Sequence, residues 1–146
     1  MHLKNKTNQD LIEYLNDLIE DSYVFISPEK LLTEKIVNEL INRIILNVES
    51  NSITQFELLE CLYNWSWFPC EENIYSNLIE SINNRKITHP SNLIVSLKIF
   101  GNSGLCRYVS FFKEFTYHEN IEVKKTALNI LHSLESNCQD SVSENS

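Results

Sequence analysis

Apolar side chains recur at intervals of three and four residues along most of this chain, the spacing that places them on one face of an α-helix. The first such run holds Leu11, Leu15 and Leu18, and the segment after it, Asp21–Ile26, is expected to be a buried connector. The pattern as a whole predicts about seven helices, near residues 8–20, 28–49, 53–66, 71–83, 90–101, 105–115 and 121–136.

Residues with strong preferences for helix ends support these boundaries. Thr7 is expected to cap the first helix, Ser27-Pro28-Glu29 to begin the second, and Pro90 to begin the fifth. The spacing Ser52-x-x-Gln55 has the form of a capping box at the start of the third. Gly101 is expected to end the fifth helix, because glycine adopts the backbone conformation that terminates helices without steric cost.

Two of the apolar runs match each other. Ser96-Leu97-x-Ile99-Phe100 aligns with Ala127-Leu128-x-Ile130-Leu131 after a shift of 31 residues. Repeats with periods between about 20 and 50 residues are typical of stacked supersecondary units. The chain is therefore predicted to be an all-α protein whose helices stack on one another.

The block from Gly101 to Leu134 resembles a HEAT repeat. Gly101-Asn102-Ser103-Gly104 corresponds to the turn between repeats, and Asn120-Ile121-Glu122-Val123-Lys124-Lys125-x-Ala127-Leu128 to the opening of a second helix. The helix Gln55–Trp65 looks like another second helix, offset by about 38 residues from the fifth. The resemblance implies a HEAT-like α-solenoid with Ala127 at a close helix contact, and an irregular helical bundle is the alternative. Residues 1–136 are expected to form one domain, followed by a disordered tail at 137–146.

Composition agrees with a helical protein inside the cell. The 146 residues include only 2 glycines and 3 prolines, whereas sandwiches and barrels need many turns. Neither a signal peptide nor a run of 18 apolar residues is evident, so a cytoplasmic location without a membrane span is expected. The cysteines lack metal-binding spacing and are interpreted as reduced thiols, at positions Cys61, Cys70, Cys106 and Cys138.

No catalytic motif is present in the sequence. A nucleophile–base signature and a glycine-rich phosphate loop are both missing, and the four histidines lie in different regions: His2, His89, His118 and His132. We therefore predict a protein that is not an enzyme and binds no cofactor or metal, with a HEAT-like enzyme as the weakest alternative. The net charge of −8 also argues against direct nucleic-acid binding, which depends on clustered Lys and Arg.

Charge is distributed unevenly along the chain. No Lys or Arg occurs from Ile44 to Asn84, a span that holds six glutamates and several large aromatic residues. The following span, 85–125, holds seven Lys or Arg against three Glu. The acidic span has two interpretations: its aromatic residues belong to the core while the glutamates are solvated, or both form a recognition surface.

The recognition hypothesis defines a candidate partner-binding site. Its acidic members are predicted to share one negative field, with one of two tryptophans as an exposed anchor; the set is Glu57, Glu60, Trp65, Trp67, Glu71 and Glu72. Carboxylates accelerate association with a cationic partner and aromatic anchors slow its release. If this surface is merely solvated, the alternative site is the polar face of the seventh helix around Lys125, Asn129 and His132.

The sequence thus favours a non-enzymatic protein-binding domain. Its size, acidity and single-domain form are similar to those of immunity proteins that neutralise a cognate basic toxin, such as a nuclease of contact-dependent growth inhibition. The similarity is one of class and not of motif. The alternative is a HEAT-like adaptor or assembly factor in a larger protein complex.

Overall fold

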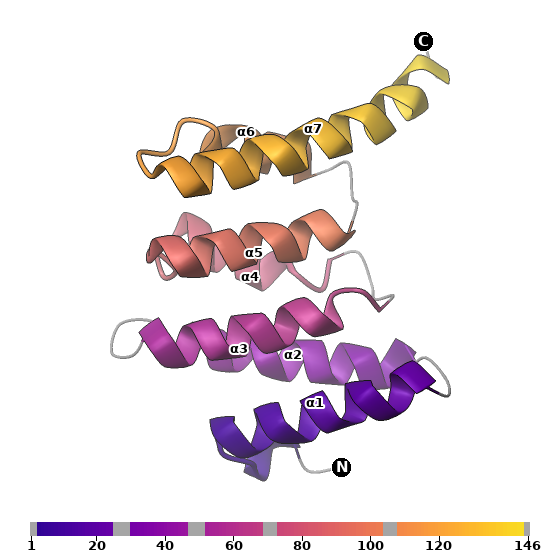
Figure 1. Cartoon of the computed structure of the whole chain (residues 1–146), viewed down its shortest axis with the longest axis vertical. Coiled ribbons are helices and arrows are strands. Elements are labelled where there is room, and N and C mark those ends of the chain that lie inside the picture. Colours follow the sequence, from indigo (N-terminus) through magenta and orange to yellow (C-terminus); the bar gives the residue numbers. More distant parts are fainter. Residues whose placement is uncertain (1–2, 25–29, 47–51, 69–72, 104–107, 145–146) are drawn as a thin grey trace.

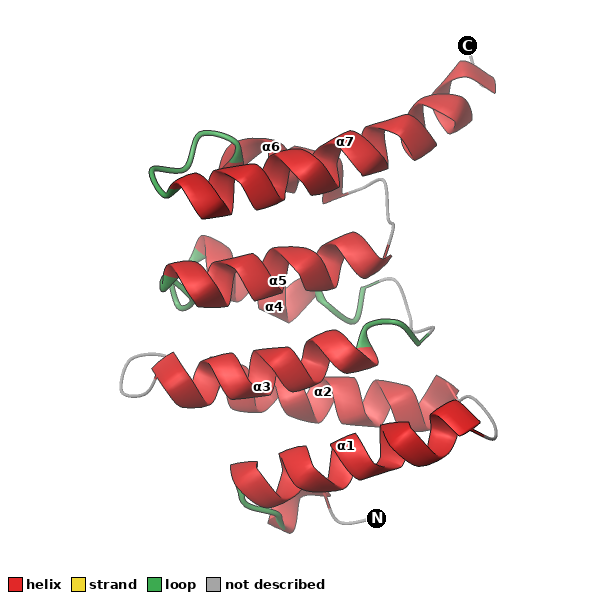
Figure 2. Cartoon of the chain, in the orientation of Figure 1, coloured by secondary structure: helices red, strands yellow, loops and turns green. Residues whose placement is uncertain are grey.

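The computed structural model describes residues 3–24, 30–46, 52–68, 73–103 and 108–144. All regular structure in these ranges is helical, which confirms the all-α prediction (Figure 2). A short 3₁₀ helix, η1, precedes seven α-helices; the bounds are η1 Leu3–Asn5, α1 Asn8–Val24, α2 Lys30–Leu46, α3 Ser52–Trp65, α4 Ser76–Asn83, α5 Pro90–Ser103, α6 Val109–Phe115 and α7 Ile121–Glu144.

The helices form a stack of two layers (Figure 1). Helices α1, α3, α5 and α7 follow one another up one layer, with α1 packed on α3, α3 on α5 and α5 on α7. Helices α2, α4 and α6 form the other layer, where α2 packs behind α3 and α6 behind α7. This all-helical arrangement is compatible with a helical-repeat fold, in which each unit covers the apolar face of the next.

The repeat seen in the sequence occupies equivalent positions in this stack. In α5 all four residues of the pattern are buried, and so are the four residues 38 positions earlier in α3: Leu58, Leu59, Cys61 and Leu62. In α7 the matching Ala127 and Leu131 are buried, but Leu128 is 45% exposed. The burial expected for Ala127 is therefore confirmed, and the exposure of Leu128 distinguishes the last unit from the two before it.

A buried hydrogen-bond cluster joins α3 to α5 near their first turns. Asn92 Nδ2 donates to Gln55 Oε1 at 2.8 Å, and Gln55 Nε2 lies 3.3 Å from the carbonyl oxygens of both Ile44 and Lys86. The side-chain amide of Gln55 thus links four segments of the chain, while the predicted capping box with Ser52 depends on a side chain outside the described residues. Near the other end of the same helix pair, Asn102 Nδ2 donates to Ser66 Oγ at 2.7 Å. These bonds satisfy polar groups that would destabilise the interface if they were buried alone.

The predicted end of the fifth helix at Gly101 is wrong, because α5 continues to Ser103. Gly101 has a different role: a Cβ added there would lie 3.1 Å from Cγ2 of Ile130, closer than such atoms normally approach. The missing side chain therefore lets α7 pack closely on α5. Gly101-Asn102-Ser103 is accordingly helical and does not form the turn that the HEAT resemblance implied.

Other predicted helix ends are confirmed by hydrogen bonds or bounds. The hydroxyl of Thr7 accepts a bond from the Asp10 amide at 3.1 Å, and α5 begins at Pro90. Asn120 Oδ1 accepts bonds from the amides of Glu122 and Val123 and so caps α7. The predicted start of the second helix at Ser27-Pro28-Glu29 lies outside the described residues, as does its predicted end near Glu49.

Two helices are longer than the sequence indicated. Helix α1 continues to Val24, where a connector was expected from Asp21. Helix α7 continues to Glu144, whereas a disordered tail was predicted from residue 137. Adding a residue to an existing helix costs far less than nucleating a new one, so a polar segment without apolar periodicity can extend a helix that packing has already fixed.

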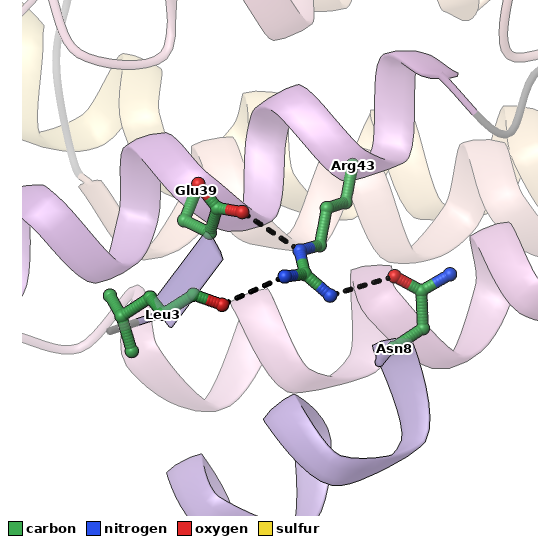
Figure 3. Close-up of polar contacts among 4 residues, drawn as sticks. All are labelled: Leu3, Asn8, Glu39 and Arg43. Carbon is green, nitrogen blue, oxygen red and sulfur yellow. Dashed lines mark hydrogen bonds and ion pairs between the residues drawn. The ribbon is translucent and has the colours of Figure 1, made fainter. Parts of the chain in front are cut away.

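The N-terminal end of the stack is held by a cluster around Arg43 (Figure 3). The guanidinium donates to Glu39 Oε1 at 2.9 Å, to Asn8 Oδ1 at 3.0 Å and to the Leu3 carbonyl at 2.8 Å. Arg43 is buried, and hydrogen bonds to these acceptors offset the free-energy cost of removing its positive charge from water. One side chain of α2 thereby fixes both η1 and the start of α1, a role that helical periodicity did not reveal.

Candidate protein-binding surface

A stripe of exposed residues runs along α3 and continues into the turn after it. Its members are separated by four, three, four and three positions, which places them on one side of the helix: Ile53, Glu57, Glu60, Asn64 and Trp67. Helix α2 lies behind α3, while α1 and α5 flank it within its own layer (Figure 1). The stripe therefore occupies the side of α3 that its neighbours leave open, with apolar residues at both ends and carboxylates between them.

The two glutamates of the stripe line a depression between α3 and α1. Its volume is about 260 Å³, and its other lining residues are Gln9, Ile12, Asn16, Cys61 and Asn64. Glu57 and Glu60 thus lie together, as the sequence predicted, and no Lys or Arg occurs on their own helix. A partner cation entering this depression would meet two carboxylates and several amide groups.

Cys61 lies at the same depression but is not a reactive thiol. It is almost fully buried, and burial raises its pKa to about 12. Because the thiolate is the nucleophilic and metal-binding form, Cys61 stays protonated and inert near neutral pH. The depression therefore offers binding groups and no activated nucleophile at this position.

The two tryptophans of the predicted site have opposite environments. Trp65 is 0% exposed and its ring lies 5.4 Å from that of Phe68, so it belongs to the core and its assignment to the binding surface is corrected. Trp67 is 63% exposed and makes an edge-on contact with Tyr63 at 6.1 Å. The two environments differ because residues two positions apart at helical spacing point to nearly opposite sides. Of the two tryptophans, Trp67 is therefore the one accessible at the surface.

The other predicted acidic residues, Glu71 and Glu72, lie outside the described residues. The structure thus brings together Glu57 and Glu60 and places Trp67 on the same stripe. Sequence reasoning missed Ile53 and Asn64, although the intervals from 53 to 67 already placed them beside the glutamates. Ile53 is 69% exposed and lies at the opposite end of the stripe from Trp67.

A second depression of about 350 Å³ lies between α5 and α7. Lys98 and Asn102 line it from α5, Asn129 and Ser133 from α7, and Tyr63 reaches it from α3. Of the alternative site predicted on the seventh helix, only Asn129 lines this depression, while Lys125 and His132 are exposed elsewhere on α7. Tyr63 connects the two regions, because it also packs against Trp67.

The described ranges hold no cluster of three or more His, Cys, Asp or Glu side chains placed to bind a metal ion. His118 has a local role, since its Nδ1 accepts the Asn120 amide at 3.0 Å and shapes the turn before α7. Among the helices placed by the structure, none has the length and apolarity needed to cross a membrane. No family model, curated protein or solved structure shows a significant match to this chain.

Proposed function

We propose that this chain is a non-enzymatic, HEAT-like protein-binding domain that uses the exposed stripe of α3, and most specifically an immunity protein that neutralises a cognate basic toxin. The observation that supports the proposal is the combination, on one open side of α3, of a pair of carboxylates with an exposed tryptophan. The remaining support is the acidic charge of −8 and the class similarity to toxin-neutralising proteins.

The stripe suits a cationic protein surface for two reasons. Glu57 and Glu60 lie in a span without Lys or Arg, so their field attracts a basic partner over several ångströms before contact. Trp67 and Ile53 then bury apolar area at the two ends, and tryptophan is among the residues most often found at binding hot spots. A nuclease toxin fits this description because its substrate-binding surface must be basic, and an acidic domain bound there would block nucleic acid from entering.

The alternative function, an adaptor or assembly factor, is favoured by further exposed apolar residues outside the α3 stripe. Tyr117, Ile121 and Leu128 are exposed around α7, at the end of the stack away from α1. An adaptor needs two binding surfaces, whereas an immunity protein needs one. Identifying what occupies the α7 end therefore distinguishes these two functions.

The proposal predicts a toxin-encoding gene immediately upstream of this chain's gene, and it is tested by binding kinetics with the toxin domain of that gene. In the double variant Glu57→Lys/Glu60→Lys, we expect association to slow by about tenfold at low salt and to lose most of its salt dependence. The matched control is Glu114→Lys/Glu119→Lys, which changes the net charge equally at exposed positions on the α6–α7 side. If both double variants slow association equally, only net charge matters and the α3 stripe is not the site.

Trp67→Ala tests the anchor separately. We expect faster dissociation with little change in the association rate, at a cost of about 2 kcal/mol if Trp67 is a hot spot. Tyr117→Ala removes an aromatic side chain that is also exposed but lies far from α3, and it should leave both rates unchanged. Unchanged dissociation of the Trp67 variant would contradict its role as an anchor.

A further inference from the structure

The side of α7 at the open end of the stack carries residues with the three–four spacing of a helix that pairs with another helix. From Ile121 the intervals are three, four, three and four, and the stripe reads Ile121, Lys124, Leu128, Leu131 and Glu135. Ile121, Lys124 and Leu128 are exposed, Glu135 is partly exposed, and Leu131 is buried with 8% of its surface still exposed. We call this set the α7 stripe.

The equivalent stripes of the inner helices are covered by the next unit. In α5 the residues matching Lys124, Leu128 and Leu131 are Leu93, Leu97 and Phe100, and all three are buried. The α7 stripe thus keeps apolar residues at its centre but has a charge near each end. A partner must therefore satisfy one cation and one anion in addition to covering Leu128.

We propose that a second copy of this chain covers the α7 stripe, with the two α7 helices packed side by side and antiparallel. The stripe is self-complementary in that orientation, with its two-fold axis between residues 129 and 130. Leu128 then lies opposite the partner's Leu131, and Lys124 lies opposite the partner's Glu135. Each contact occurs twice, so both charges are paired and the apolar centre is closed.

The register extends along α7 in both directions. In this antiparallel register, Ile121 lies opposite the position that Cys138 occupies in the partner's sequence. Cys138 continues the three–four spacing of the stripe along the sequence. The last turns of α7 extend beyond α5 and α6 (Figure 1), and an antiparallel second copy would run along them. Isolated helical turns are only marginally stable in water, so a neighbouring helix would stabilise this extension.

The charges that surround the α7 stripe are compatible with this pairing. Lys113 Nζ of α6 is 3.9 Å from Glu135 Oε1, and both side chains remain substantially exposed, so the carboxylate keeps oxygen lone pairs for a second cation. The α3 stripe lies two helices away in the same layer, so association through α7 would leave it accessible. A dimer of this kind would present two copies of the surface proposed for partner binding.

The test is the mass of the full chain by sedimentation equilibrium, together with a charge exchange across the α7 stripe. We expect the natural chain to dimerise and Lys124→Glu or Glu135→Lys to weaken association by about tenfold, since each variant opposes like charges twice. The double variant Lys124→Glu/Glu135→Lys restores opposite charges and should dimerise like the natural chain. Leu128→Glu should be monomeric, with its helical content by circular dichroism unchanged.

The control is Lys98→Glu/Glu122→Lys, which exchanges the same two charge types away from the stripe and should not affect association. A chain that stays monomeric up to millimolar concentration would overturn the proposal. So would a double charge exchange that fails to restore association, or a dimer that survives Leu128→Glu. These outcomes are independent of toxin binding, because they require no other protein.

Discussion

Helices α5 and α7 carry the same apolar pattern but differ in what covers it. In α5, which has α3 on one side and α7 on the other, Leu97 is 0% exposed. In α7, which ends the stack, the matching Leu128 is 45% exposed. The apolar pattern on a helix therefore shows which side of the helix can be buried. Whether that side is buried depends on the presence of a neighbouring helix.

The sequence of α7 also differs from that of α5 at one equivalent position. Where α5 has the buried Leu93, α7 has the exposed Lys124. The charge at position 124 makes this side of α7 more polar than the equivalent, covered side of α5.

The largest expected effect compares the two equivalent leucines directly. Leu97→Ala should lower the free energy of unfolding by about 2–5 kcal/mol, because it leaves a cavity between packed helices. Leu128→Ala should lower it by less than about 1 kcal/mol, since water already reaches this side chain. Urea unfolding of both variants, at concentrations where the chain is monomeric, measures the difference. Equal losses would show that the end of the stack is covered.

A smaller effect is expected at Ala127, which is buried although it belongs to the terminal helix. Ala127→Leu should destabilise the protein by about 1–3 kcal/mol, because the added atoms overpack a contact between helices. Leu replacing the exposed Asn129 provides the control, and it should change stability only slightly. Thermal unfolding followed by circular dichroism checks both. An unchanged midpoint for the Ala127 variant would indicate that α7 packs loosely throughout.

The smallest effect concerns how the two helices begin. The start of α5 is tied to α3 through Asn92 and Gln55, whereas the start of α7 relies on the local cap formed by Asn120. Asn120→Ala should cost about 1 kcal/mol, and Asn120→Asp should restore most of it because aspartate also caps helices. Chemical denaturation measures both variants. A loss well above this range would mean that Asn120 also supports the packing of the last unit.

Much of the fold could be predicted from the sequence because local rules govern it. The three–four periodicity located all seven α-helices, and side chains such as Thr7 and Asn120 marked helix starts through bonds to nearby amides. Besides the lengths of α1 and α7, an error arose where a distant contact decides the outcome. Gly101 was interpreted from its own backbone freedom, yet its role depends on Ile130, a residue of another helix. Gln55 also bonds to distant groups in α2 and α5, which the local spacing from Ser52 could not show.

The candidate site was predicted less well than the fold. The pairing of Glu57 with Glu60 follows from helical spacing, and both line one depression. Choosing between Trp65 and Trp67 required knowing which side of α3 is covered by other helices. The sequence of α3 alone does not show this. Residues from α1 that line the same depression could not be found from the sequence alone, because nothing in the spacing relates α1 to α3.

Packing between helices that are near in sequence has a consequence for how the chain is made. Its main helix contacts join elements that are adjacent or next but one in the chain, such as α2 with α3 and α3 with α5. As the polypeptide emerges from the ribosome, α3, α5 and α7 each find a main packing partner that has already been made. The N-terminal units can therefore pack before α7 is translated, and the time during which apolar surfaces await a partner is short.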